Sequence, residues 1–213
     1  MAGRALLDLF YSPCCAFCSR PDWRGVCPDC EARLPRPAHP VWERPDVGCC
    51  AAPMAYRGMA REAVMRFKFG RKPELAAGLA LLLARCAAEL PAFDLVTWVP
   101  LSDRRRRERG YDQARLLARS AGRALGKPSA ALLKKVRHNP PQSGADEETR
   151  RSNVSGAYRA LSVPQGARIL LIDDVITTGA TLAECRRVLL EAGAASVVCA
   201  CAAAAEAPWG RRI

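Results

Sequence analysis

The chain has 213 residues, half of them hydrophobic and a quarter charged, which excludes a disordered chain and fits one α/β domain with a small appendage. Its 33 basic and 21 acidic residues give a net charge of +12, which favours phosphate-bearing ligands or nucleic acid as partners. The most apolar stretch, residues 75–84, is too short to span a membrane, and the brief apolar run at residues 4–10 does not resemble a secretory signal. We therefore expect a cytoplasmic protein without a membrane span.

Two cysteine knuckles dominate the N-terminal segment. Two residues separate Cys15 from Cys18, and two separate Cys27 from Cys30. Four thiolates in this spacing complete one tetrahedral zinc site, and metal ligation would supply much of the folding energy of so small a segment. Reduced, unliganded cysteines and disulfides are the alternatives, and the spacing in a reducing compartment favours zinc over both. Cys14 is an alternative ligand to Cys15, and the spacing allows either.

A proline-rich segment follows the cysteines. Four prolines between residues 34 and 47 predict a stiff connector rather than a regular element. We therefore predict two domains. Residues 1–48 hold an N-terminal helix, the cysteine module and the proline-rich linker, and residues 49–213 form the main domain.

Hydrophobic periodicity in the main domain alternates between strand and helix patterns, which is typical of a parallel sheet flanked by helices. Helices are predicted over residues 5–10, 57–67, 75–90 and 111–125, and strands over residues 52–56, 93–99, 131–136, 169–172 and 196–201. Residues 138–148 have the composition of a mobile loop.

An arginine-rich run follows the strand that ends at Pro100. Five of the six residues from Arg104 to Arg109 are arginine. A solvated charge run needs no function, but this one comes directly after the carboxyl end of a strand. That position favours contact with a diphosphate group.

The strongest motif is ARILLIDDVITTGAT, residues 167–181. A buried strand runs into two carboxylates, Asp173 and Asp174, and then into a small polar turn before a helix. Backbone N–H groups of such a turn and of the first helical turn converge on an anion, aided by the helix dipole. Gly179 permits the positive φ that this nest requires, and the threonine hydroxyl groups add donors. The alternative is an ordinary strand, turn and helix capped by Asp and Thr.

This stretch resembles the phosphoribosyl-pyrophosphate (PRPP) loop of type I phosphoribosyltransferases. The order of further pieces along nearly the whole chain resembles the ComF family of competence-associated, phosphoribosyltransferase-like proteins. The matching pieces are Cys15, Cys18, Cys27, Cys30, Lys68-Phe69-Gly70, Pro100-Leu101, Arg109-Gly110-Tyr111-Asp112-Gln113, Gln142, Arg151-x-Asn153-Val154 and Asp173 to Thr181. Many members carry Asn at the position of Asp112, and many carry a second pair of knuckles that this chain lacks, so we expect one zinc ion.

The resemblance implies a type I phosphoribosyltransferase-like α/β fold, a mostly parallel sheet flanked by helices, with a small zinc-ribbon-like module at the N-terminus. Asp173 and Asp174 would be the catalytic carboxylates that hold the ribose diol. PRPP with Mg²⁺ would be bound by Thr177, Thr178, Gly179, Ala180 and Thr181 at the 5′-phosphate, by Leu101, Ser102, Arg104 and Arg109 at the diphosphate, and also by Val175.

Two functions from different classes are compatible with these residues. The first is an enzyme that transfers a phosphoribosyl group from PRPP to an acceptor. The second is a single-stranded-DNA-associated accessory protein of DNA uptake, in which the fold binds or senses. The net charge of +12 and the zinc module favour the second function, whereas residues 167–181 favour the first.

Overall fold

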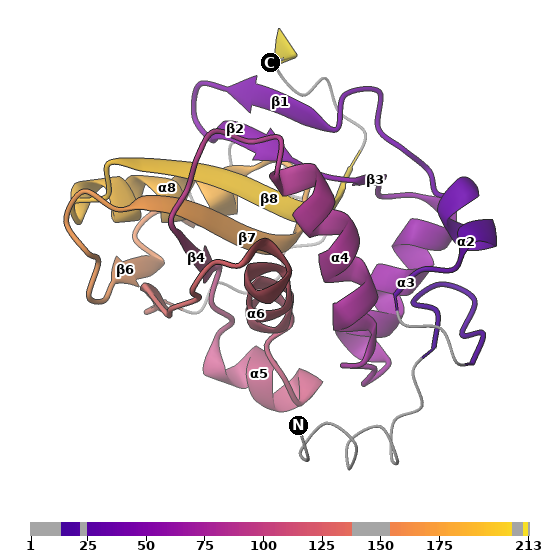
Figure 1. Ribbon diagram of the computed structural model, residues 1–213. Helices are drawn as coiled ribbons and strands as arrows, with labels where there is room; N and C mark the ends of the chain where they lie inside the picture. The colour runs from indigo at the N-terminus through magenta and orange to yellow at the C-terminus, as the bar shows by residue number, and fades with distance from the viewer. Residues whose placement is uncertain (1–13, 22–24, 138–153, 206–210, 213) are drawn as a thin grey trace.

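The computed structural model describes residues 14–21, 25–137, 154–205 and 211–212 (Figure 1). The helices are α2 (Pro28–Ala32), α3 (Gly58–Phe69), α4 (Leu75–Ala87), α5 (Asp103–Arg109), α6 (Gln113–Leu125) and α8 (Ala180–Glu191). The strands are β1 (Val41–Arg44), β2 (Gly48–Ala51), β3 (Met54–Ala55), β4 (Leu95–Trp98), β5 (Leu133–Lys135), β6 (Tyr158–Ala160), β7 (Arg168–Ile176), β8 (Ser196–Ala204) and β9 (Arg211–Arg212). The predicted helix 5–10, the predicted loop 138–148, and Gln142, Arg151 and Asn153 lie outside the described residues.

The main sheet has the strand order β4-β7-β8-β2-β1-β9, and β3 also pairs with β8. Strands β4, β7, β8, β2 and β3 pair in parallel, whereas β1 pairs antiparallel with β2 and β9 at one edge. The sheet is therefore mostly parallel, as predicted. Parallel strands end at the same edge of a sheet, which brings the residues after β4 close to the end of β7.

Helices cover both faces of the sheet (Figure 1). Helices α3, α4 and α6 pack on one face with Leu170 and Ile172 of β7. Helix α8 and the two-stranded β5–β6 ribbon pack on the other face with Ile169 and Leu171. Because alternate residues of β7 point to opposite faces, its unbroken apolar run is what a strand buried on both sides requires.

The proline-rich segment corrects one prediction. Residues 34–47 were expected to lack regular structure, but Val41–Arg44 form strand β1. Pro40 and Pro45 flank this strand rather than interrupt its ladder, and the side chain of Trp42 is buried. The domain boundary after residue 48 stays a prediction. Strand β1, which lies before that boundary, belongs to the main sheet.

The cysteine segment is fixed to helices α3 and α4. Arg66 of α3 donates hydrogen bonds to the carbonyl oxygens of Ala16 at 3.0 Å and Phe17 at 2.6 Å. A Cβ at Gly78 of α4 would lie 2.7 Å from the carbonyl oxygen of Gly25, so glycine is required for this close approach. Figure 1 shows α2 beside these two helices. No helix among the described residues is long and apolar enough to cross a membrane.

Candidate functional site

A cavity of about 140 Å³ opens where β4 and β7 end, and it brings charged side chains together from several elements. Its lining residues are Lys68, Val99, Pro100, Leu101, Arg105, Arg109, Gln113, Ala114, Lys135, Tyr158, Asp173, Asp174 and Thr181. The cavity therefore combines an acidic pair with four basic side chains. We refer to it as the acid-pair cavity.

Asp173 and Asp174 belong to β7 itself, because the strand continues to Ile176 rather than ending at residue 172. Asp174 forms an ion pair with Nζ of Lys68 at 2.8 Å, and both side chains are largely buried. Asp173 accepts a hydrogen bond from the backbone N–H of Asp174 at 2.8 Å, yet it keeps some solvent-accessible surface. Desolvation, followed by the neighbouring Asp174 carboxylate, raises the pKa of Asp173 to about 8, with Lys68 acting in the opposite direction. Asp173 therefore retains its proton at a higher pH than an exposed aspartic acid does.

This raised pKa predicts a pH dependence of stability. The pKa of Asp in an unfolded chain is ~4. Between that pH and the folded-state pKa of about 8, the folded state binds more protons than the unfolded state. The contribution of Asp173 to stability is consequently largest at low pH and is lost as the pH rises through the folded pKa. We expect the melting temperature of the wild type to fall more steeply than that of Asp173→Asn between about pH 6 and pH 8, measured by thermal unfolding in matched buffers. Parallel slopes for the two proteins would contradict the raised pKa.

The basic wall of the cavity comes from α5, α6 and β5. Nη1 of Arg109 donates to Oε1 of Gln113 at 3.0 Å, and its guanidinium lies 5.0 Å from the ring centroid of the exposed Phe69. The buried Gln113 keeps its Nε2 without a hydrogen-bond partner within the described part of the chain. Lys135 donates to the hydroxyl of Tyr158 at 3.3 Å, and burial lowers the pKa of Lys135. These donors line the same cavity as the acidic pair.

The arginine-rich run forms helix α5, and its helical phase separates neighbouring arginines. Arg105 lines the acid-pair cavity, whereas Arg104 is exposed and forms an ion pair with Glu108 at 2.8 Å. Ser102 caps the helix, because its hydroxyl accepts from the backbone N–H of Arg105 at 3.3 Å. The Ser102 hydroxyl is therefore used in capping α5, and Leu101 rather than Ser102 lines the acid-pair cavity.

Asp112 caps helix α6, a role that an Asn side chain could also fill. Its carboxylate accepts from the backbone N–H groups of Arg115 at 3.0 Å and Leu101 at 3.4 Å, which joins the start of α6 to the segment after β4. An Asn side chain has an oxygen that accepts in the same way. Burial raises the pKa of Asp112, so the neutral Asn avoids a desolvation cost.

The predicted phosphate loop, residues 177–181, lies between β7 and α8. Gly179 has φ +82°, as predicted, and precedes the first residue of α8. Thr181 reaches the acid-pair cavity; Thr177 is exposed, Thr178 is half-buried, and Val175 packs partly into the core. Ala180 donates its backbone N–H to Oγ1 of Thr178 at 3.5 Å. The loop thus borders the cavity at its helix end.

The β1–β2 hairpin braces this loop. Nη1 of Arg44 donates to the carbonyl oxygen of Thr178 at 3.0 Å, while Nε and Nη2 bind the Asp46 carboxylate at 3.0 and 2.7 Å. A Cβ at Gly179 would lie 3.0 Å from Cγ2 of Val47, so the hairpin packs closely against the turn. The loop conformation depends on residues more than 130 positions away in the sequence.

Replacing Arg44 by Gln should loosen the loop without removing a ligand contact. We expect the affinity for ribose 5-phosphate to fall about fivefold, because one charge-assisted hydrogen bond to the loop is lost. Calorimetric titration measures the change, and Arg168→Gln, which breaks an exposed ion pair with Asp94 at the other end of β7, is the matched control. Equal affinities in the two variants would show that the hairpin does not position the loop.

Four cysteines form a potential metal centre in the segment that packs against α3 and α4. The sulfur atoms of Cys15, Cys18, Cys27 and Cys30 all lie within 4.8 Å of one another. The backbone N–H of Cys27 points to the sulfur of Cys15 at 3.4 Å. Cys14 is not part of the cluster, so the structure favours Cys15 in the choice that the sequence left open. A four-thiolate donor set of this kind fits zinc.

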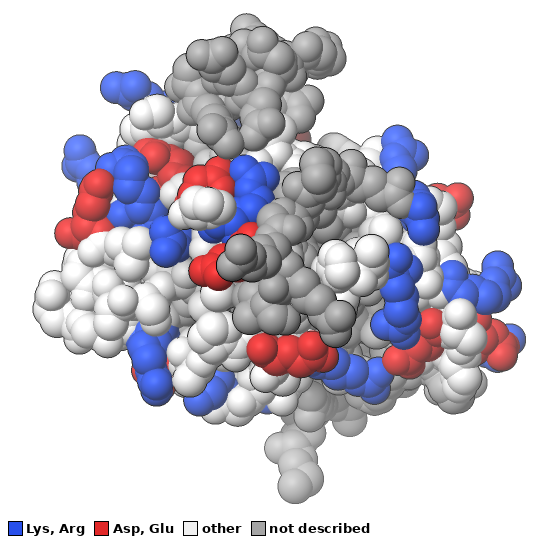
Figure 2. All heavy atoms as spheres, turned by 90° about the horizontal axis from the view of Figure 1, so that it is seen from above, with Lys and Arg blue, Asp and Glu red and all other residues white. Residues whose placement is uncertain are grey.

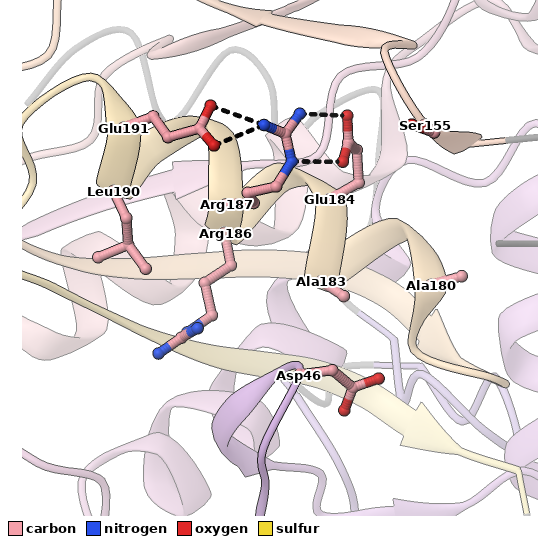
Figure 3. Close-up of a pocket in the computed structure, with 9 residues that line it drawn as sticks. All are labelled: Asp46, Ser155, Ala180, Ala183, Glu184, Arg186, Arg187, Leu190 and Glu191. Carbon is pink, nitrogen blue, oxygen red and sulfur yellow. Dashed lines mark hydrogen bonds and ion pairs between the residues drawn. The ribbon is translucent and has the colours of Figure 1, made fainter. Parts of the chain in front are cut away.

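A second cavity, of about 440 Å³, lies on the outer side of α8 (Figure 3). Arg187 is held there between Glu184 and Glu191 at 2.9 and 2.6 Å, so its charge is already neutralised. Arg186 extends to the other side of the helix. Neither Asp173 nor Asp174 lines this larger space. The acid-pair cavity is therefore the candidate functional site although it is smaller, because it combines an acidic pair with four basic side chains.

The sequence-based site prediction missed several residues that line the acid-pair cavity. Lys68, Arg105, Lys135 and Tyr158 come from four different elements, and no local pattern links them. Only two local signals were present in the sequence. Lys68 belongs to the Lys68-Phe69-Gly70 match, and Ser102 with Gly110 marks the two ends of a helix that turns Arg105 and Arg109 to one side.

Comparison with known proteins identifies one matching domain family and several relatives of this chain. The phosphoribosyl transferase domain family matches residues 110–212. The DNA utilization protein YhgH of Salmonella typhi is 31% identical over 212 residues, which covers 91% of each chain. The competence protein ComFC of Bacillus subtilis is 32% identical over 189 residues, which covers 86% of this chain and 74% of the relative.

A solved structure, the glutamine PRPP amidotransferase of B. subtilis, matches with 24% identity and a TM-score of 0.44. The match covers 65% of this chain and 30% of that one. Adenine phosphoribosyltransferase from Thermoanaerobacter pseudethanolicus matches with 17% identity and a TM-score of 0.36, over 61% of this chain and 67% of that one.

Proposed function

Since the chain belongs to the ComF family of phosphoribosyltransferase-like proteins, we propose that it binds PRPP, or ribose 5-phosphate and diphosphate, with Mg²⁺ in the acid-pair cavity and transfers the phosphoribosyl group to an acceptor. The observation that carries the proposal is the juxtaposition of Asp173 and Asp174 with Arg105 and Arg109 in one cavity beside the loop 177–181. A phosphorylated sugar with a diphosphate leaving group needs acceptors for its diol and donors for both phosphate ends.

In this proposal each group has one task. Asp173 and Asp174 accept hydrogen bonds from the ribose 2′- and 3′-hydroxyls, and loop 177–181 binds the 5′-phosphate through its backbone and hydroxyl donors. Arg105, Arg109 and the free Nε2 of Gln113 bind the diphosphate. Mg²⁺ bound with the diphosphate would neutralise part of its charge, and the side-chain oxygens of Asp173 and Asp174, which line the same cavity, would be available to hold it.

The same groups suit the bond-breaking step. When the bond between C1 of the ribose and diphosphate breaks, the electron pair leaves with the diphosphate and C1 becomes cationic. Arg105 and Arg109 stabilise the departing anion, and the negative charge of the acidic pair stabilises the cationic sugar in the same cavity. Lys68 holds the Asp174 carboxylate in position through their 2.8 Å ion pair.

The two neighbouring arginines of α5 test the diphosphate assignment. We expect Arg105→Gln to weaken PRPP binding about tenfold in calorimetry with Mg²⁺, because a charge-assisted contact inside the cavity is lost. Arg104→Gln should change it less than about twofold, since Arg104 faces solvent and pairs with Glu108. A larger loss of PRPP affinity in Arg104→Gln than in Arg105→Gln would support the sequence-based assignment of Arg104 instead. If the wild type did not bind PRPP, the proposed function would be refuted.

The second candidate function is a single-stranded-DNA-associated role in DNA uptake. It is favoured by the names of relatives, among them competence protein F of Haemophilus influenzae, 35% identical over 61% of each chain, and by the net charge of +12. On the face seen in Figure 2, however, basic and acidic side chains of the described residues lie in small mixed groups. Affinity for a single-stranded oligonucleotide with a steep salt dependence, unaffected by Thr178→Ala, would favour this function.

Zinc at the cysteine cluster and a cytoplasmic location belong to the same proposal. Four closely placed thiols support both, because a reducing compartment keeps thiols in the reduced form that binds zinc.

A further inference from the structure

A third cavity, of about 480 Å³, lies between α5, α6 and β5 and has no place in the proposed function. Five basic side chains line it against two acidic ones. The basic residues are Arg106, Arg115, Arg119, Lys134 and Lys135. We call this space the basic cleft.

The two acidic residues of the basic cleft already have partners. Asp103 pairs with Arg106 at 3.0 Å, and Asp112 accepts the backbone N–H groups of Leu101 and Arg115. No carboxylate of the described residues forms an ion pair with the side chains of Arg115, Arg119 or Lys134. Three like charges gathered around one cavity repel one another, and a bound anion with several charges removes that repulsion.

One wall of the cleft is apolar. Trp98, which is 8% exposed, lines it with Leu133, and the guanidinium of Arg115 lies 5.9 Å from the centroid of the Trp98 ring. Leu161, a large hydrophobic residue that is 49% exposed, closes the same space. An inorganic ion would leave this wall unused, whereas an aromatic base would cover it.

The cleft adjoins the acid-pair cavity. The two spaces share Pro100, Leu101 and Lys135, so ligands in both would lie on opposite sides of the segment that follows β4. The basic side chains converge on one cavity of nucleotide size instead of running in a stripe across the surface, which favours a small polyanion over a nucleic-acid strand.

We propose that the basic cleft binds a nucleoside polyphosphate, with its phosphates on Arg115, Arg119 and Lys134 and its base against Trp98 and Leu161. This inference does not depend on whether the acid-pair cavity catalyses transfer.

The test titrates ATP into the full zinc-loaded chain without Mg²⁺, in the presence of excess ribose 5-phosphate, by calorimetry and by tryptophan fluorescence, to which four tryptophans contribute. Arg115→Gln and Arg119→Gln should each weaken ATP binding about tenfold, because each removes a charged phosphate donor. Both side chains are exposed on α6, so the fold should persist. Arg123→Gln, one turn along the same helix and outside the cleft, is the matched control and should change the affinity less than about twofold.

Three outcomes would overturn the proposal. The wild type could fail to bind ATP, the Arg115 and Arg119 variants could bind it as well as Arg123→Gln does, or Thr178→Ala could lose ATP binding, which would put the nucleotide in the acid-pair cavity. Trp98→Phe should abolish the fluorescence change but retain the calorimetric signal. Binding of oligothymidylate that depends on Arg115 and Arg119, without binding of ATP, would assign the cleft to nucleic acid instead.

Discussion

Replacing Asp174 by Ala should lower the affinity for PRPP about 100-fold, the largest effect that we expect from one substitution in the cavity. The change removes a ligand for the ribose diol and also leaves Lys68 without its ion-pair partner in a largely buried position. Asp173→Ala should weaken binding by a smaller factor, because that carboxyl retains its proton more readily. Calorimetry with PRPP and Mg²⁺ measures both changes.

Two controls separate this loss of binding from a loss of structure. Asp94→Ala removes an exposed carboxylate near the opposite end of β7 and should leave PRPP affinity unchanged. Asp174→Asn is the second control, because it retains the volume of the side chain while removing its charge. The melting temperature of each variant shows whether its fold persists. Unchanged PRPP affinity in Asp173→Ala and Asp174→Ala would remove the ribose assignment altogether.

Replacing Cys27 by Ser should abolish zinc binding and lower the melting temperature by about 10 °C, since the buried thiol lies at the centre of the cluster and metal ligation contributes folding free energy. Metal analysis of the purified protein, together with thermal unfolding, tests both parts of this expectation.

Cys14→Ser is the matched control for the zinc prediction, because Cys14 is adjacent in sequence but outside the cluster. It should retain one zinc ion per chain and melt within about 2 °C of the wild type. Loss of zinc from Cys14→Ser with retention in Cys15→Ser would reverse the ligand assignment. A wild-type protein that purifies without zinc would refute the metal centre.

Much of the fold could be predicted from periodicity. The apolar runs of β4, β7 and β8 and the helical spacing of α3, α4 and α6 are local patterns, and each matched the element observed. Strand β1 was missed because prolines dominate its surroundings, whereas the burial of Trp42 and pairing with β2 decide its structure. Long-range pairing of this kind leaves no local signal.

The site could be predicted only where its residues are contiguous. The acids and the loop 177–181 form one motif, so their placement at the edge of the sheet followed from the sequence. Lys68, Lys135 and Tyr158 meet the acids only because the topology brings α3 and the β5–β6 ribbon to that edge. The choice between Arg104 and Arg105 depended on recognising residues 103–109 as a helix. All seven residues are charged, so no hydrophobic periodicity indicates the helix.

The contact between Arg44 and the carbonyl oxygen of Thr178 bears on how the protein can be dissected. A fragment starting at residue 49 would contain every residue of the acid-pair cavity yet lack the Arg44 guanidinium and the Val47 side chain that contact the turn at residues 178–179. Such a fragment should fold less stably than the intact polypeptide and, if the proposed function holds, bind sugar phosphates more weakly. Residues 1–48 and the acid-pair cavity are therefore not structurally independent, and an N-terminal truncation that removes Arg44 and Val47 also perturbs the border of the cavity.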